Sequence, residues 1–176
     1  LFGHPQFEKP ILFYWVICLC FKIFGISEFA SRLGPLVAGI ATVVITYLWG
    51  VVLFRSRRIA FVSAIVLATA AEFVVVSRIV LTDVYLCLFI TGALFSFSLG
   101  YENQKIRKTA WFFVFVSCAL GFLTKGPIGV IFPWMGILGF LSFNREAGLV
   151  KQFPWFLGLI AFSAIGLAWY ALMTAK

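Results

Sequence analysis

Apolar runs separated by short charged segments fill almost the whole chain. The first run covers residues 10–24, and six more runs follow it at 33–54, 59–76, 84–100, 110–124, 128–143 and 153–174. Apolar stretches of this kind are typical of transmembrane helices, because about 20 residues of helix cross the roughly 30 Å hydrocarbon core of a bilayer. The pattern therefore predicts about six transmembrane helices.

The first run differs from the others because it is short and also contains a lysine. Its 15 residues would reach about 22 Å as a helix, and Lys22 falls in its last turns. A helix of this length and charge fits the surface of a bilayer better than its centre. We expect residues 10–24 to form an interfacial or re-entrant helix.

The composition supports this class of fold. Hydrophobic residues make up 63% of the chain, charged residues make up 11%, and the mean hydropathy is +1.09. A soluble globular protein has an apolar content nearer half, so we predict an all-α integral membrane protein. The net charge of +8 would suit a nucleic-acid partner only if the basic residues formed a water-exposed patch. They form short clusters between apolar runs instead, and we expect no nucleic-acid partner.

The basic clusters also predict the orientation in the membrane. Three connections between the runs carry Arg55, Arg57, Arg58, Lys105, Arg107, Lys108, Arg145 and Lys151. Because cytoplasmic loops are enriched in lysine and arginine, these connections are assigned to the cytoplasm. If the short first run does not cross, the alternation of the helices then brings four charged residues together on the outer face. They are Glu8, Lys9, Asp83 and Lys125.

Each of these four residues also has a purely structural interpretation. Lys9 and Lys125 would anchor helices at the headgroups, and Glu8 would pair with Lys9. Asp83 would cap the helix that follows it. For the set, a functional interpretation is favoured, because Asp83 and Lys125 lie at tight outer turns and outside the basic clusters. Glu72 is a separate case, since it falls inside an apolar run, where a carboxyl is protonated, paired or functional.

A reaction on a lipid-linked phosphate would use such a set of charges. Cations stabilise a phosphate as it becomes a leaving group, and carboxylates hold a metal ion or position the substrates. Lys9 and Lys125 suit the phosphate. Phe7, Tyr14 and Trp15 would line an apolar groove for a polyprenyl chain at the same level of the membrane.

Four blocks of sequence resemble one family of enzymes. They are Phe7-Glu8-Lys9-Pro10 with Leu12-Phe13-Tyr14-Trp15, the segment from Phe24 to Leu33, Arg78-Ile79-Val80-Leu81-Thr82-Asp83, and Gly121-Phe122-Leu123-Thr124-Lys125-Gly126-Pro127. In order and spacing they are similar to the bacterial membrane glycosyltransferases related to protein O-mannosyltransferases and to the aminoarabinose transferase of lipid A. The resemblance covers the chain from about Leu1 to Pro133. One departure is Ile11, where the family motif usually has a second proline.

The resemblance implies a type C glycosyltransferase fold, with a polytopic helical core in the bacterial cytoplasmic membrane and an active site that faces the periplasm or exterior. It implies transfer of a sugar from a polyprenyl-phosphate donor to lipid A, a protein or another glycan. The residues implied at the donor are Lys9, Tyr14, Arg78, Asp83 and Lys125. Glu8 is the candidate ligand of a divalent metal ion.

The same resemblance predicts that part of the catalytic machinery is elsewhere. In such relatives the proposed general base is an aspartate in an acidic loop that precedes the Phe-Glu-Lys-Pro block. We expect residues 1–176 to be a fragment that forms a single transmembrane domain, without a catalytic residue and without any C-terminal outer domain. The fragment alone is expected to be inactive.

Two other classes of protein remain open. A secondary transporter should show an internal repeat and helices broken near the middle of the membrane, and we find no convincing repeat. A non-catalytic membrane subunit would explain each charge separately, but it gives no reason for Asp83 and Lys125 to lie at outer turns. The shared outer position of these residues favours the glycosyltransferase.

Overall fold

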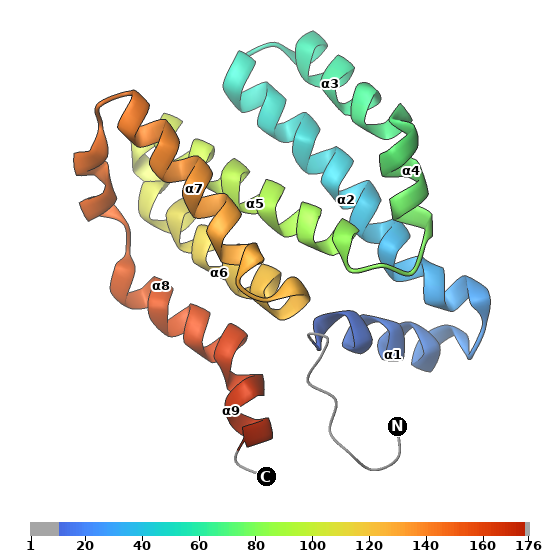
Figure 1. Ribbon diagram of the computed structural model, residues 1–176. Coiled ribbons are helices and arrows are strands. Elements are labelled where there is room, and N and C mark those ends of the chain that lie inside the picture. Colours follow the sequence, from blue (N-terminus) through green and yellow to red (C-terminus); the bar gives the residue numbers. More distant parts are fainter. Residues whose placement is uncertain (1–10, 175–176) are drawn as a thin grey trace.

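Every element of the fold is a helix in the computed structural model, which describes residues 11–174 (Figure 1). The α-helices are α1 (Leu12–Phe24), α2 (Glu28–Phe54), α3 (Arg57–Thr69), α4 (Ala71–Arg78), α5 (Asp83–Glu102), α6 (Arg107–Lys125), α7 (Ile128–Phe143), α8 (Trp155–Phe162) and α9 (Ala168–Thr174). Three shorter helical segments connect them: η1 (Gln104–Ile106), η2 (Ala147–Gln152) and η3 (Ser163–Leu167). The prediction of an all-α fold is confirmed.

Three helices are long and apolar enough to cross a bilayer within the part of the chain that the structure describes. They are α2, α5 and α6, the last counted together with η1. The pair α3 and α4 would make a fourth span if its two helices are taken together. The helices α1, α7 and Trp155–Ala171 are apolar but shorter. The chain is therefore a membrane protein with several spans, and the number six stays a prediction.

The run at residues 59–76 does not form the single helix that the sequence predicts. It is divided at Ala70, and α3 and α4 are bent by 62° at this break. The hydroxyl of Thr69 donates to the carbonyl of Ile65 at 2.8 Å, a side-chain bond that competes with the regular helical pattern. Glu72 lies in the first turn of α4 and is exposed, where the free N–H groups of a helix start stabilise a carboxylate.

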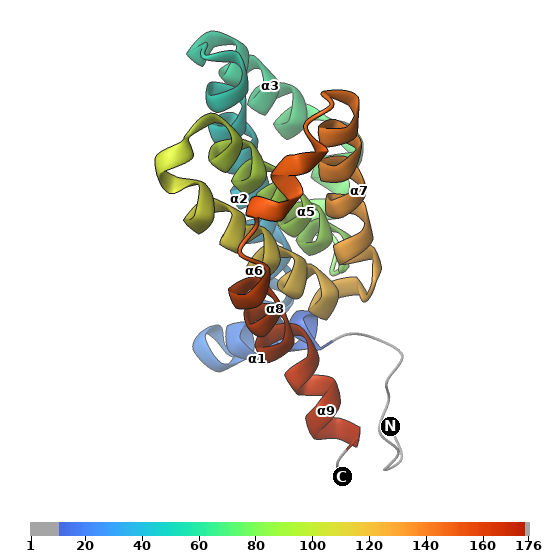
Figure 2. The same ribbon diagram turned by 90° about the vertical axis from the view of Figure 1, so that its left-hand side faces the viewer.

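The helices α2, α5, α6 and α7 form the centre of the structure. The most extensive contact is between α5 and α6, and α2 packs on α5. The helices α3 and α4 lie along α2, on the side away from α6 (Figure 1). The helix α7 packs against α5 and α6, and α8 packs against α6 (Figure 2). This arrangement brings the start of α5 to the same end of the bundle as the end of α6.

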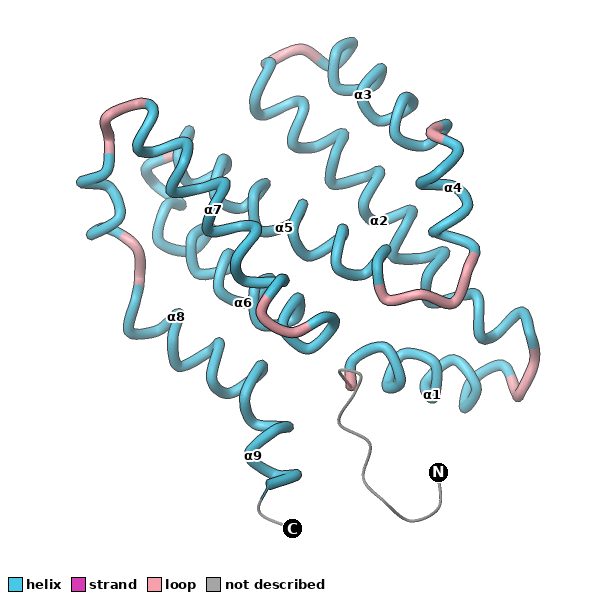
Figure 3. The backbone as a smooth tube through the Cα atoms, in the orientation of Figure 1, coloured by secondary structure: helices cyan, strands magenta, loops and turns pink. Residues whose placement is uncertain are grey.

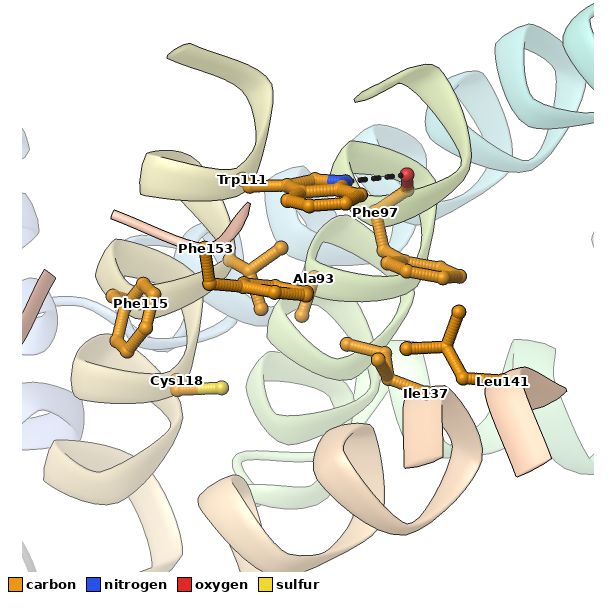
Figure 4. Packing of buried hydrophobic residues seen from close by; sticks show 9 residues of the cluster. Ala93, Phe97, Trp111, Phe115, Cys118, Ile137, Leu141 and Phe153 are labelled. Carbon is orange, nitrogen blue, oxygen red and sulfur yellow. Dashed lines mark hydrogen bonds between the residues drawn. The ribbon is translucent and has the colours of Figure 1, made fainter. Parts of the chain in front are cut away.

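An aromatic cluster fixes the opposite end of α5 and α6. The indole N–H of Trp111 donates to the carbonyl of Phe97 at 3.1 Å, and Phe153 stacks on Trp111 with ring centroids 4.1 Å apart (Figure 4). Trp111 lies directly against the backbone of α5, because a Cβ at Gly100 would be only 2.6 Å from the indole ring. Stacked aromatic pairs contribute about 0.5–1.5 kcal/mol each beyond burial, so this cluster ties α5, α6 and the segment after η2 together.

The short helix α1 lies across the other end of the bundle, roughly crosswise to α2 and α5 (Figure 1). It has 13 residues, and its buried residues Leu12 and Phe13 join a second core cluster with Ala38, Val84, Tyr85 and Leu123. Residues of α2, α5 and α6 thus hold the first turn of α1. A short helix at this position is confirmed, and its crosswise direction agrees with the predicted interfacial location.

Candidate functional site

Two turns lie at the same end of the bundle as α1. One is the connection 79–82 between α4 and α5, and the other is the reversal at Gly126 and Pro127 between α6 and α7 (Figure 3). The basic connections that follow α2, α5 and α7 lie at the opposite end (Figure 1). Asp83 and Lys125 were predicted to lie at one end and the basic clusters at the other, and the structure confirms this separation.

Asp83 and Lys125 form an ion pair. The ammonium group of Lys125, the last residue of α6, donates to Oδ1 of Asp83, the first residue of α5. Both charges are favourably placed, because the N-terminus of a helix stabilises an anion and the C-terminus a cation. The side chains are 42% and 46% exposed, so a ligand can reach them. The structure therefore joins two predicted site residues that are 42 positions apart in sequence.

The structural interpretation of Asp83 as a helix cap does not hold, because its carboxylate pairs with Lys125. The N-cap residue of α5 is Thr82, whose side chain makes no capping hydrogen bond. Asp83 follows it as the first helical residue and uses its carboxylate for Lys125.

The chain reversal after Lys125 fixes the end of α6 and therefore the position of the Lys125 backbone. Gly126 has a φ of +71°, a left-handed conformation that glycine adopts without steric cost. Its N–H donates to the carbonyl of Phe122 at 2.8 Å and closes α6. Pro127 is the residue immediately before α7, where its fixed φ fits the entry to a helix and its missing N–H has no consequence. Lys125 is thus held at the last position of α6.

Two glycines allow α6 and α7 to approach each other just below this turn. A Cβ at Gly129 would lie 2.2 Å from the carbonyl carbon of Gly121, and one at Gly121 would lie 3.1 Å from the carbonyl oxygen of Gly129. The two backbones are therefore in direct contact. This role of the two glycines was not predicted from the sequence, although both are four residues from Lys125, one on each side. That symmetrical spacing about a Gly-Pro turn is the signal that could have indicated the contact.

The buried residues beneath the pair come from three helices. Val84 and Tyr85 follow Asp83 on α5, Leu123 precedes Lys125 on α6, and Phe13 of α1 meets the ring of Tyr85 edge to face with centroids 6.0 Å apart. The first turn of α1 is thus docked beside the ion pair. Two further predicted site residues, Glu8 and Lys9, lie outside the residues that the structure describes.

An apolar groove with a volume of about 440 Å³ runs between α1, α2 and α5. Its walls are Leu12, Val16, Leu19, Cys20, Ile23 and Phe24 of α1, Leu33, Gly34, Val37, Ala38 and Ala41 of α2, and Tyr85, Leu88 and Phe89 of α5. The groove thus begins within one helical turn of Asp83. The hydroxyl of Tyr85 is buried there and has no hydrogen-bond partner within residues 11–174.

The groove uses a different face of α1 from the one that the sequence analysis selected. Its α1 residues recur with helical spacing, whereas Tyr14 and Trp15 are not among the lining residues. Tyr14 is 44% exposed and contacts the ring of Phe13, and Trp15 meets the ring of Trp169 of α9. Because α1 is apolar almost all round, the side that faces α2 was not readable from its sequence.

Arg78 lies at the same end but apart from the ion pair. It is exposed at the end of α4 and borders a small groove of about 280 Å³ between α2 and α4. Within the described part of the chain, no salt bridge involves Arg78. The structure therefore brings together Asp83 and Lys125 and leaves Tyr14 and Arg78 outside their contact.

The described residues alone do not fit a divalent metal ion. No group of three or more potential His, Cys, Asp or Glu ligands occurs in residues 11–174, and the carboxylate of Asp83 already faces the ammonium of Lys125. Hard divalent cations require several oxygen ligands. The role of Glu8 as a metal ligand stays a prediction.

Comparison with known proteins agrees with the arrangement of these helices. The chain is similar over 96% of its length to the crystal structure of ArnT from Cupriavidus metallidurans bound to undecaprenyl phosphate, with a TM-score of 0.90 and 22% sequence identity. The chain covers 32% of that protein. This likeness shows that the two share the fold of this helical core.

Curated relatives include one from Proteus mirabilis, named undecaprenyl phosphate-alpha-4-amino-4-deoxy-L-arabinose arabinosyl transferase 1. The two are 34% identical over 129 residues, which is 72% of this chain and 24% of the relative. A transferase of the corresponding name from Erwinia tasmaniensis is 27% identical over 96% of this chain and 29% of its own length. The chain thus spans about a quarter to a third of these relatives.

A family profile gives the classification directly. The profile described as dolichyl-phosphate-mannose-protein mannosyltransferase matches residues 8–169, which is nearly the whole chain and includes both members of the ion pair. The chain belongs to the dolichyl-phosphate-mannose-protein mannosyltransferase family of membrane glycosyltransferases.

Proposed function

We propose that the protein transfers a sugar from a polyprenyl-phosphate donor to a lipid or protein acceptor, and that the donor phosphate binds at the Asp83–Lys125 pair. The observation that carries this proposal is an exposed cation and carboxylate close in sequence to an apolar groove, since Asp83 is two residues from Tyr85 in the lining of that groove. A polyprenyl phosphate has the same two parts in the same order, a charged head and a long apolar tail.

Lys125 supplies the charge that the reaction needs. When the bond between sugar and phosphate breaks, negative charge grows on the phosphate, and a fixed ammonium group stabilises the transition state more than the ground state. Asp83 holds the ammonium group in place before the donor arrives. An ion pair exposed to this degree contributes only about 0–1 kcal/mol to stability, so the lysine exchanges Asp83 for a phosphate at little cost.

The apolar groove between α1, α2 and α5 accepts the first prenyl units of the donor in this proposal. Its lining is almost wholly apolar, which favours an isoprenoid over a sugar or a nucleotide. The similarity to ArnT, whose crystal structure was determined with undecaprenyl phosphate, supports the same class of ligand. Tyr14, Arg78 and Lys9 remain proposed contributors to the donor site from the surrounding outer surface.

We also propose the orientation of the site. The positive-inside rule assigns the end with Arg55, Lys105, Arg107 and Lys151 to the cytoplasm, and the ion pair lies at the other end. The donor phosphate would then bind at the periplasmic face of the inner membrane. This topology counts α3 with α4, α7, and Trp155–Ala171 as spans in addition to α2, α5 and α6, and it leaves α1 in the interface.

Binding of the lipid phosphate tests this proposal without requiring the complete reaction. Purified full-length protein would be titrated with undecaprenyl phosphate as the wild type, as Lys125→Ala and as Lys22→Ala. Lys22 is the matched control, because it is an exposed lysine on α1 that is not in the ion pair. We expect weaker binding for Lys125→Ala and no change for Lys22→Ala. Equal affinity of all three proteins would contradict a phosphate site at Lys125, and it would favour a non-catalytic subunit or a transporter.

A further inference from the structure

A second cleft lies at the end of the bundle that is opposite to the Asp83–Lys125 pair. It has a volume of about 840 Å³ and lies between the start of α6, the end of η2 and the start of α8. Its lining residues are Gln104, Arg107, Lys108, Lys151, Gln152, Phe153, Pro154, Trp155, Phe156 and Leu157. Neither the family assignment nor the proposed donor site uses this cleft.

The lining is divided into a polar half and an apolar half. The polar half has the two amides and the three cations Arg107, Lys108 and Lys151, and no aspartate or glutamate is among the described residues that line the cleft. The apolar half is one continuous segment, residues 153–157. The cleft therefore matches a ligand with an anionic head and an apolar body.

Two of the three cations, Lys108 and Lys151, are unpaired among the described residues, whereas Arg107 also borders a neighbouring pocket that contains Glu102 and Glu146. Glu102 pairs with Arg55 at 2.8 Å, and Glu146 accepts a hydrogen bond from Tyr101 at 2.8 Å. Within residues 11–174, Lys108 and Lys151 have no salt-bridge partner. Two exposed ammonium groups thus face the same cleft without an anion.

Arg107 is already held in a fixed position at the base of the cleft. Its Nη1 donates to Oε1 of Gln152 at 2.7 Å, its Nε donates to the carbonyl of Gly100 at 3.1 Å, and its guanidinium lies 5.2 Å from the centroid of the Trp111 ring. The aromatic cluster that contains Trp111 and Phe153 (Figure 4) thereby supports the polar half of the cleft from below. An anion that enters meets a preorganised guanidinium group with two exposed ammonium groups beside it.

The apolar half is ordered on one side and open on the other. The indole N–H of Trp155 donates to the carbonyl of Val150 at 2.9 Å, and the ring stacks on Trp134 at 5.1 Å. Phe156 and Leu157 are 78% and 60% exposed. In a bilayer these two side chains face acyl chains, and an aromatic ring next to lysines marks the headgroup level.

We propose that this cleft binds an anionic glycerophospholipid from the leaflet at the basic end of the protein. The phosphate of the lipid contacts Lys108 and Lys151, and one acyl chain lies along Phe156 and Leu157. Basic pockets between membrane helices recognise anionic headgroups in this way. A neighbouring apolar helix would fill only the apolar half and would bury the lysines without an anion, which is unfavourable. Charge complementarity therefore selects the lipid as the occupant.

The experiment uses full-length protein in detergent from which bound lipid has been removed. The protein is titrated with phosphatidylglycerol, phosphatidylcholine or sn-glycerol 3-phosphate. Native mass spectrometry counts the lipid molecules that are bound. We expect saturable binding of phosphatidylglycerol, weak binding of phosphatidylcholine and no competition by glycerol 3-phosphate. The double variant Lys108→Gln with Lys151→Gln should lower the affinity for phosphatidylglycerol by about 30-fold, because each cation near a membrane surface contributes about 1 kcal/mol.

The matched control removes the same charge elsewhere at this end. Arg58→Gln with Lys105→Gln changes two exposed cations that do not line the cleft, and it should leave the affinity unchanged. The variant Lys108→Arg with Lys151→Arg should retain binding if it folds like the wild type. An equal loss in both glutamine variants would show diffuse surface charge and would overturn the proposal. Competition by glycerol 3-phosphate would show a free-phosphate site, and absence of saturable lipid binding would also contradict it. Sugar transfer is not the readout, so failure here leaves the donor site unaffected.

Discussion

An ion pair joins Lys125 at the end of α6 to Asp83 at the start of α5. These two residues are the opposite ends of a hairpin formed by the two helices. The antiparallel packing of α5 on α6 makes this contact possible, because the N-terminus of one helix then meets the C-terminus of the other. The pair is exposed and lies above a buried cluster. Because the pair is exposed and the cluster is buried, we expect the pair to contribute to ligand binding and the cluster to contribute to folding.

The first prediction concerns that separation. Lys125→Ala and Asp83→Asn should each change the free energy of unfolding by no more than about 1 kcal/mol, because exposed ion pairs contribute little to stability. Thermal unfolding in detergent checks this, with Phe153→Ala as a variant that is expected to be unstable. A large loss of stability in Lys125→Ala would mean that the pair is structural.

The second prediction concerns the contact of α6 with α7. Gly129→Ala should destabilise the protein by about 1–3 kcal/mol, as is usual when an extra methyl group is forced into a packed interface. The backbone of Gly121 blocks the new Cβ and cannot move out of its way without shifting α6. Thermal unfolding and yield after purification are the measurements.

Gly139→Ala is the control for this prediction. Gly139 is in the same helix, and no atom lies within 4 Å of a Cβ built there. Alanine favours a helix by about 1 kcal/mol over glycine, so this variant should be neutral or more stable. Equal behaviour of the two variants would contradict the close approach of α6 and α7.

The third prediction concerns the aromatic cluster at the basic end. Phe153 is 4% exposed and stacks on Trp111, so Phe153→Ala should cost about 3–5 kcal/mol. Phe143 is 89% exposed, and Phe143→Ala should have almost no effect. Urea or thermal unfolding of the two variants is the measurement. An equal loss of stability in both variants would contradict the assignment of Phe153 to this core.

The sequence predicted the long helices well, because apolar length alone determines them. The predicted runs 84–100 and 110–124 lie within α5 and α6. Each helix extends beyond its run by only one to three residues at either end. The break at Ala70 was not predicted, because Glu72 beside it was interpreted as a charge within one helix and the competing hydrogen bond of Thr69 depends on the local backbone. The hydrophobicity of a segment indicates that it lies in a membrane, but it does not indicate where the helix bends.

The candidate site was predictable only to the level of the membrane face. Alternation of the helices placed Asp83 and Lys125 at one end, but their direct contact depends on which helices are neighbours, and the apolar runs do not encode this. The face of α1 was not predictable for a related reason. Leu12 and Tyr14 belong to the same apolar and aromatic run, yet Leu12 lines the groove and Tyr14 is exposed.

The fourth prediction concerns topology. In a full-length protein without other cysteines, Pro127→Cys should react with a membrane-impermeant thiol reagent from outside intact cells, and Ser56→Cys should react only after the membrane is opened. Pro127 is exposed at the α6–α7 turn and Ser56 begins α3 at the basic end. The reverse pattern would place the ion pair in the cytoplasm.

Sugar transfer by Lys125→Ala distinguishes a lysine that acts on the donor phosphate from one that only anchors α6 at the membrane surface. The measurement is the rate of transfer from a polyprenyl-phosphate sugar by purified full-length protein, compared with the wild type, Lys125→Arg and the control Lys22→Ala. We expect the rate with alanine to fall by about 100-fold or more, as for the loss of one preorganised electrostatic group. Arginine should restore part of the rate, because it keeps the charge but differs in shape. A Lys125→Ala protein that folds normally and transfers sugar at the wild-type rate would contradict the account.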